Sequence, residues 1–211
     1  LYRKFTYHVR MSGQASLMGS LTDQIENLYA NNYLLKLGDR FQVFVDAATK
    51  WEAFPVQKQK DFFQHWVWPF LRKDNKVCVI ISDAMRYEIG DELLSLIRQE
   101  DRYSAELEPI LAMLPSYTQL GMAALLPNKA LAIADNETGT VLVDGQSSQG
   151  TMNRGKILSA GIDGKTAAAL TAEDFIAMPR DGDNGYRSLF SSNDVVYIYH
   201  NRIDAVGDKR D

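Results

Sequence analysis

The sequence has a single cysteine, Cys78, and no long hydrophobic run. One cysteine excludes an internal disulfide framework and fits a reducing compartment. Cys78 stands within an apolar stretch, so we interpret it as a small core residue. No segment approaches the roughly 20 apolar residues that cross a bilayer, and the N-terminus shows no secretory signal pattern. We therefore expect a cytoplasmic protein without a membrane partner.

The sequence has fewer basic than acidic residues. The chain has 23 Lys and Arg residues against 27 Asp and Glu residues, a net charge of -4. A general coating of nucleic acid requires a basic surface, so this class of protein is disfavoured. A substrate that carries phosphate remains compatible, because bound divalent cations can supply local positive charge.

The two parts of the sequence differ in their patterning. Residues 1–75 form an expected helical N-terminal region, with helical periodicity from about Ser16, a possible interruption at Gly38 and a second helix over 57–71 that Pro69 ends or kinks. Residues 1–13 show no clear period. Residues 76–211 alternate strand and helix patterns, which indicates the α/β class. The chain lacks an initiator Met and stops soon after an acidic motif, so we expect a piece of a longer protein.

About five strands are expected in residues 76–211. The run at 77–81 is continuously apolar and rich in β-branched residues, which is typical of a strand buried on both faces. The other expected strands lie at 103–107, 131–134, 140–143 and 195–199. Helices are expected at 85–98, 118–126, 147–160, 172 onward and around 186–190, and Thr171 begins a capping box.

Acidic residues follow the first and last of these strands. In an open α/β sheet, ligands gather outside the carboxyl ends of the strands. Asp83 either caps the helix that follows or ligates a metal. The two roles can also coexist, with one carboxylate oxygen serving each. Asp204 and Asp208 are four residues apart and could hold one cation, although a solvated loop is the alternative. His200 at the same strand end is equally compatible with a structural hydrogen bond.

Hydroxyl residues and one arginine complete the candidate site. Ser116 and Thr118 precede an apolar helix, where they either cap the helix or provide a nucleophile that needs a base or a metal. The polar segment 145–154 is either a plain loop or an anion site to which Arg154 contributes.

These motifs together resemble the PglZ family, the phosphatase-like component of BREX phage-defence systems in the alkaline phosphatase superfamily. The resemblance rests on VIISDAMRYE at 79–88, LPSYTQLGMAALLP at 114–127, DGQSS at 144–148 with NR at 153–154, and HNRID at 200–204. The helical front, including YANNY at 29–33, is similar to the region before the PglZ core. The implied fold is an alkaline phosphatase-like central sheet flanked by helices, truncated at the C-terminus and preceded by a helical segment.

The resemblance also implies roles for single residues. Asp83 matches the first metal ligand, Thr118 matches the nucleophile that also contacts metal, and Asp204 begins an Asp-x-x-Gly-His metal motif. Asp208 replaces the His of that motif, which favours Mg²⁺ or Mn²⁺ over Zn²⁺. Two divalent ions are expected in the complete protein, with the remaining ligands beyond residue 211. The expected substrate-binding residues are Arg86, Ser116, Arg154 and His200.

The implied function is metal-dependent phosphoryl transfer, by a phosphatase or phosphodiesterase for which nucleic acid is a candidate substrate. Other BREX proteins, such as the methyltransferase, are the expected partners. The alternative is a catalytically degenerate scaffold in a defence complex. A third alternative, an unrelated nucleotide-binding module, lacks the expected Gly-rich phosphate loop, because Asp83 and Arg86 stand after the first strand.

Overall fold

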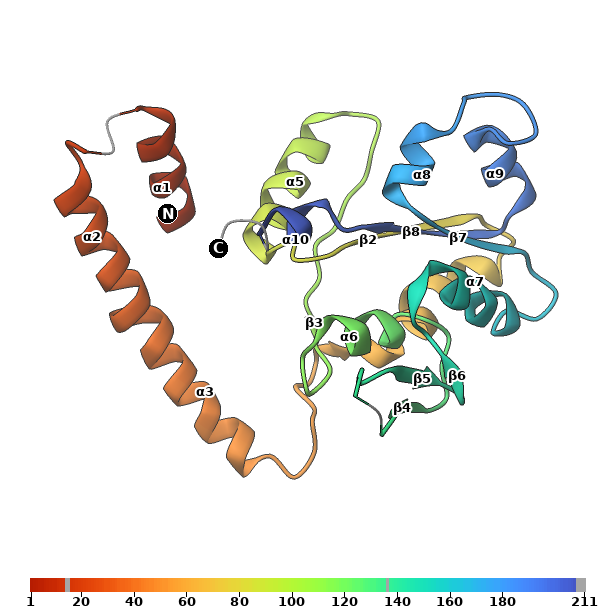
Figure 1. Cartoon of the computed structure of the whole chain (residues 1–211), viewed down its shortest axis with the longest axis horizontal. Helices are drawn as coiled ribbons and strands as arrows, with labels where there is room; N and C mark the ends of the chain where they lie inside the picture. Colours follow the sequence, from red (N-terminus) through yellow and green to blue (C-terminus); the bar gives the residue numbers. More distant parts are fainter. Residues whose placement is uncertain (14–15, 136, 208–211) are drawn as a thin grey trace. The chain divides into compact units, whose positions relative to one another are not determined.

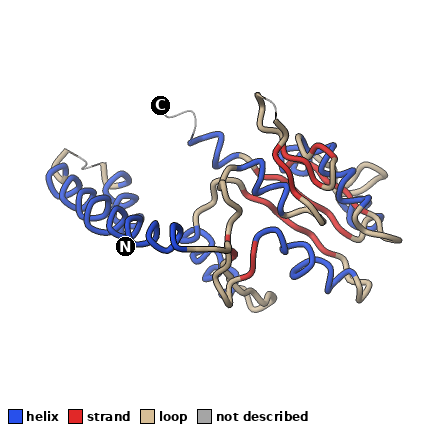
Figure 2. Tube along the Cα trace, turned by 90° about the horizontal axis from the view of Figure 1, so that it is seen from below, coloured by secondary structure: helices blue, strands red, loops and turns tan. Residues whose placement is uncertain are grey.

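The chain divides into two compact units, Leu1–Trp51 and Glu52–Asp211. The structure is a computed structural model and describes residues 1–13, 16–135 and 137–207. The described strands all belong to the second unit, whereas the first contains helices only (Figure 2). The division into domains at residues 75 and 76 stays a prediction, and the boundary between the compact units follows Trp51.

The first unit contains more helix than the sequence predicted. Its elements are α1 (Tyr2–Met11), α2 (Gly19–Asn27), the π-helical η1 (Leu28–Leu34) and α3 (Leu35–Ala47). Helix α1 lies where no period was visible, and the stacked rings of Tyr2 and Tyr29, 4.0 Å apart, connect it to η1. Gly38 stays inside α3, because one glycine costs a helix only about 1 kcal/mol.

The second unit begins with short elements in place of the single helix expected over 57–71. They are β1 (Gln57–Lys58), the 3-10 helix η2 (Gln59–Asp61), the π-helical η3 (Phe63–Val67) and α4 (Trp68–Leu71). Three apolar residues of this segment, Phe63, Val67 and Leu71, are nevertheless fully buried at spacings of four residues. Pro69 lies in the first turn of α4, where its missing N–H leaves no helical bond unmade.

A parallel sheet in the order β2-β8-β7 forms the centre of the second unit. Its strands are β2 (Val77–Ser82), β8 (Val195–His200) and β7 (Ala167–Thr171). In Figure 1, α6 (Thr118–Ala124) and α7 (Gly150–Ala160) lie on one side of this sheet. Helices α8 (Ala172–Ala177) and α9 (Tyr186–Ser192) lie on the other side. The α/β class predicted from the sequence is therefore confirmed at the level of mixed helix and strand.

The middle strand β8 is buried on both faces. Val195, Tyr197 and Tyr199 face the core formed with α6 and α7, whereas Val196 and Ile198 face α8 and α9. The sequence predicted double burial for β2 instead, and that prediction is wrong, as is the core position expected for Cys78: Cys78 is exposed and Ile80 is 67% exposed. The cluster formed by α8 and α9 includes residues of β7 and β8 and none of β2. One face of β2 is thus uncovered in the described part of the chain.

The remaining elements follow the sequence prediction in part. They are α5 (Tyr87–Gln99), β3 (Ile110–Leu111), β4 (Leu131–Ile133), β5 (Val141–Val143), β6 (Gln146–Ser147) and α10 (Arg202–Gly207). Residues 103–107 are not a strand, since their alternation has no partner strand and the Ala105 carbonyl accepts a hydrogen bond from Arg98 instead. Within the described residues, no helix is long and apolar enough to cross a membrane.

Candidate active site

The carboxyl ends of β2 and β8 lie side by side. Ser82 pairs with His200 in the parallel register, and the Ser82 hydroxyl lies 2.8 Å from His200 Nδ1. One residue later, the Asp83 amide donates to the His200 carbonyl at 2.9 Å. These contacts give His200 a hydrogen-bonding role between the strands, and they fix where the Asp83 carboxylate leaves the sheet.

Asp83 does not cap the following helix. Its Oδ1 accepts a hydrogen bond from the Ala84 amide at 2.9 Å, and Ala84 has a φ of 57°, which few non-glycine residues adopt. Helix α5 begins later, after Arg86, whose side chain makes no capping bond. The capping interpretation is therefore wrong, because this tight turn separates Asp83 from the first turn of the helix.

Asp83 and the two hydroxyl residues border one cavity of about 470 Å³. Ser116 and Thr118 are exposed, and Thr118 is the first residue of α6. The capping residue of α6 is Tyr117, which makes no side-chain capping bond. Neither Ser116 nor Thr118 therefore serves as the cap, and both hydroxyl residues stand beside the cavity that Asp83 also borders.

Gln59 holds the segment that carries these hydroxyl residues, and the sequence did not single it out. Its Oε1 accepts from the Met113 amide at 3.1 Å, and its Nε2 donates to the Gly121 carbonyl at 3.2 Å. The Tyr117 hydroxyl adds a bond to the Gly139 carbonyl at 3.2 Å. Gln59 also borders the cavity. No local pattern marks such a residue, because its partners are distant in sequence.

The second acidic position follows the end of the neighbouring strand β8. Asp204 is half-buried in α10, directly after β8, and does not border the 470 Å³ cavity. Asp208 lies outside the described residues. Among the residues that the structure does describe, no group of three His, Cys, Asp or Glu side chains could hold a metal ion. Of the candidate metal ligands in the described residues, Asp83 and Thr118 are the two that border this cavity.

The two candidate arginines have different surroundings. Arg86 is largely exposed, and its Nε lies 3.1 Å from the Glu88 carboxylate. Arg154 is half-buried on α7: its Nε donates to the Ser148 carbonyl at 3.0 Å, and its Nη1 lies 3.0 Å from Met122 Sδ. Met122 borders the cavity, so Arg154 is one side chain away from it. Neither arginine lines the cavity itself.

The arrangement of strand ends and cavity can be compared with known proteins. A family model described as the BREX system PglZ alkaline phosphatase-like domain matches residues 62–211. The chain belongs to the PglZ family. The PglZ resemblance inferred from the sequence is thereby confirmed, and the match covers β2, the cavity segment and β8.

Two curated relatives extend the PglZ similarity over nearly the whole chain. The chain is 38% identical over 213 residues to the alkaline phosphatase-like protein BrxZ of Escherichia coli O9:H4 (strain HS), with 99% of the chain covered. It is 36% identical over 209 residues to the alkaline phosphatase-like protein PglZ of Bacillus cereus (strain H3081.97), with 98% covered. The chain spans 24% of the length of each relative.

Proposed function

We propose that the complete protein is a metal-dependent hydrolase of phosphate esters in which Thr118 is the nucleophile. One observation carries this proposal: Asp83 and Thr118, far apart in the sequence, border the same cavity at the carboxyl end of β2. Open α/β sheets place ligands at this edge. The PglZ match, whose description contains the words alkaline phosphatase-like, supports the choice of reaction class.

The donors at this edge suit a hard divalent cation. Carboxylate and hydroxyl oxygens are ligands that Mg²⁺ and Mn²⁺ prefer over the nitrogen and sulfur ligands common for Zn²⁺. We propose four metal ligands. Asp83 and Thr118 would bind from the cavity, and Asp204 and Asp208 would bind from the end of the neighbouring strand β8. Asp204 and any further ligands have to approach this cavity in the complete protein. A bound divalent cation would supply positive charge that favours the deprotonated Thr118 hydroxyl.

In this proposal Thr118 carries out the chemistry and the other residues bind the substrate. Thr118 Oγ forms a bond to phosphorus while the ester oxygen leaves, and water later releases phosphate from Thr118. We assign to Ser116, which borders the same cavity, the donation of a hydrogen bond to the phosphoryl group. Arg86, Arg154 and the strand-end His200 are the further residues that we assign to substrate binding. Nucleic-acid phosphodiesters are one candidate substrate, and other BREX proteins, including the methyltransferase, are the proposed partners.

The proposal is tested by turnover of the complete protein on phosphate monoesters and diesters with Mg²⁺, Mn²⁺ or Zn²⁺. Thr118→Ala should lower the rate by about 10³-fold or more, because it removes the nucleophile. Ser116→Ala is the matched control from the same cavity and should lower the rate far less. A rate in Thr118→Ala close to the unsubstituted rate would contradict the proposal.

One observation favours the second candidate, a catalytically degenerate scaffold in a defence complex. Asp204 does not border the cavity, and the described residues contain no three-membered metal-binding group. Calorimetric titration of the complete protein with Mn²⁺ separates the two functions. Binding that Asp83→Ala or Asp204→Ala abolishes supports the hydrolase, whereas the scaffold predicts no binding at these carboxylates.

A further inference from the structure

The hydroxyl of Tyr199 is buried, and no described residue meets it with full hydrogen-bond geometry, although the nearby Arg154 guanidinium interacts with it and acts to lower its pKa. The residue is 5% exposed, and burial raises the pKa of its hydroxyl to about 12. Tyr197, two residues earlier on the same face of β8, donates its hydroxyl to the Leu125 carbonyl at 2.8 Å. An unpaired buried hydroxyl is unfavourable and calls for an explanation, since most such groups are paired.

Arg154 lies beside this hydroxyl and is itself incompletely paired. Its guanidinium carbon is 4.7 Å from the centre of the Tyr199 ring, a cation–π distance. Of its five donors, one meets the Ser148 carbonyl and another meets the Met122 thioether, which is a weak acceptor. No carboxylate among the described residues pairs with it. A half-buried positive charge with spare donors therefore adjoins a buried hydroxyl that lacks a well-formed hydrogen bond.

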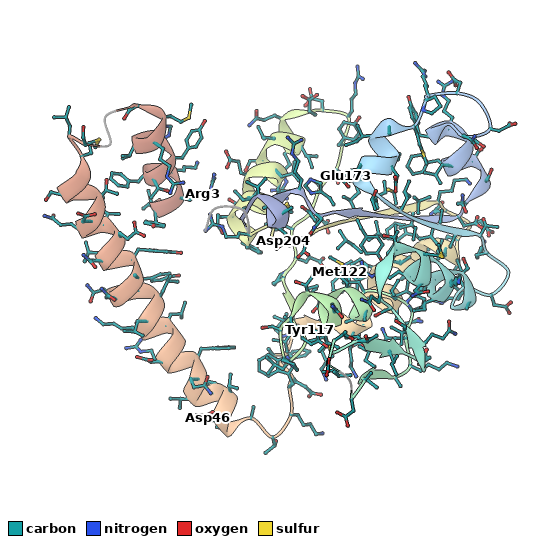
Figure 3. All side chains as sticks on the ribbon, viewed as in Figure 1. Arg3, Asp46, Tyr117, Met122, Glu173 and Asp204 are labelled. Atoms are coloured by element: carbon teal, nitrogen blue, oxygen red, sulfur yellow. The ribbon has the colours of Figure 1, made fainter. Side chains whose placement is uncertain are left out.

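Both groups adjoin residues that border the cavity next to Thr118. Met122, which touches Arg154, borders this cavity and stands one helical turn after Thr118 on α6. Ile81, which also borders it, pairs with Tyr199 across β2 and β8. Figure 3 labels Met122 between α6 and the strands. The flexible Met122 side chain thus separates the cavity from the arginine, and its three rotatable bonds allow it to move aside.

We propose that Tyr199 and Arg154 form a phosphate-binding pair, reached from the Thr118 cavity when Met122 moves aside. The Tyr199 ring orients the guanidinium, and its hydroxyl and the free arginine donors bind the oxygens of a phosphate group. The inference rests on the proposed function only for the identity of the bound group as the phosphoryl group of the substrate. It adds Tyr199 to the binding residues expected from the sequence.

The experiment is calorimetric titration of the complete protein with inorganic phosphate in the presence of EDTA, paired with thermal unfolding. Tyr199→Phe keeps the ring and removes the hydroxyl. It should weaken phosphate binding by about tenfold, since a charge-assisted hydrogen bond is lost. It should lower Tm much less than Tyr197→Phe does, because the Tyr199 hydroxyl loses only an imperfect contact with Arg154. Arg154→Gln should weaken binding at least as much.

Tyr197→Phe is the matched control from the same strand. It should lower Tm, because the Leu125 carbonyl loses its donor, and leave phosphate affinity unchanged. Unchanged affinity in Tyr199→Phe, or no phosphate binding by the unsubstituted protein, would overturn the inference. The titration involves neither metal nor turnover. A result that refutes Thr118 as the nucleophile would therefore not refute the phosphate-binding pair. A result that refutes the pair would likewise not refute Thr118 as the nucleophile.

Discussion

The carboxamide of Gln59 donates to the carbonyl of Gly121 at 3.2 Å, a bond between an irregular segment and the middle of α6. The same carboxamide accepts from the Met113 amide, so one side chain connects both ends of the segment 113–121. Ser116 and Thr118 lie within that segment and border the cavity next to it. The placement of the candidate nucleophile therefore depends on a residue from a different part of the chain.

Replacing Gln59 should disturb the segment that carries Thr118. Gln59→Ala leaves the Met113 amide and the Gly121 carbonyl without these partners. We expect a loss of about 2 kcal/mol in the free energy of unfolding, at about 1 kcal/mol for each bond. Urea denaturation measures this loss. Gln57→Ala is the matched control, since Gln57 is exposed on β1 and should change stability little. Equal effects of the two substitutions would argue against the connecting role of Gln59.

The close approach of Gly161 to Pro127 predicts a position-specific effect of an added methyl group. A Cβ at Gly161 would lie 2.6 Å from Pro127 Cβ and 3.3 Å from the Ile157 carbonyl oxygen. Gly161→Ala should therefore cost about 1–3 kcal/mol through forced movement of packed groups. Gly90→Ala is the control, because its Cβ would meet only Leu107 at an ordinary 3.5 Å. Comparable midpoints of chemical denaturation for both variants would contradict the clash.

The Thr171 side chain caps the start of α8, and this cap is directly testable. The Thr171 hydroxyl accepts from the Asp174 amide at 3.1 Å and donates to the Asp174 carboxylate at 2.7 Å. Thr171→Ala should lower the free energy of unfolding by about 1 kcal/mol, the usual value of such a cap. Thr171→Ser keeps the hydroxyl and should retain most of the stability. Equal Tm values for Thr171→Ser and Thr171→Ala would show that the cap contributes nothing measurable.

Burial of Tyr199 predicts a loss of stability at alkaline pH. Its pKa is raised from 10.0 to about 12 in the folded protein. Above pH 10 the unfolded chain releases this proton first, so the stability present below pH 10 falls as pH rises toward 12. The loss reaches about 3 kcal/mol. Denaturation midpoints from pH 9 to 12 measure it, and Tyr199→Phe should flatten the curve. If the midpoints of Tyr199→Phe fall with pH as steeply as those of the unsubstituted protein, other groups cause the loss of stability at alkaline pH.

Local patterns predicted several elements well. Strands β2 and β8 are dense in β-branched or aromatic residues, and α5 has apolar residues at helical spacing. The Thr171 cap of α8 was also recognised in the sequence and is confirmed, although the Asp174 carboxylate accepts from the Thr171 hydroxyl and not from its backbone N–H as in a full capping box. These signals depend on neighbours a few residues away, which explains why one sequence suffices to find them.

Other elements were missed because their formation depends on partners far along the chain. Strand β7 is rich in alanine, a weak strand former, and exists because it pairs with β8 over its full length. Residues 103–107 alternate between apolar and polar residues and yet form no strand, since no strand of the described residues pairs with them. Gln59, Met122 and Tyr199 near the candidate site carried no sequence signal of a functional role for the same reason.

The sequence by itself determined the residue types at the candidate site, the family resemblance that the PglZ match confirms, and most of the regular elements around β2 and β8. Only the tertiary structure decided that Asp83 and Thr118 share a cavity, that Asp204 does not border it, and that one face of β2 is uncovered. The physical reason is that these are relations between segments distant in sequence. They depend on how the helices pack on the sheet, which periodicity along one segment does not encode.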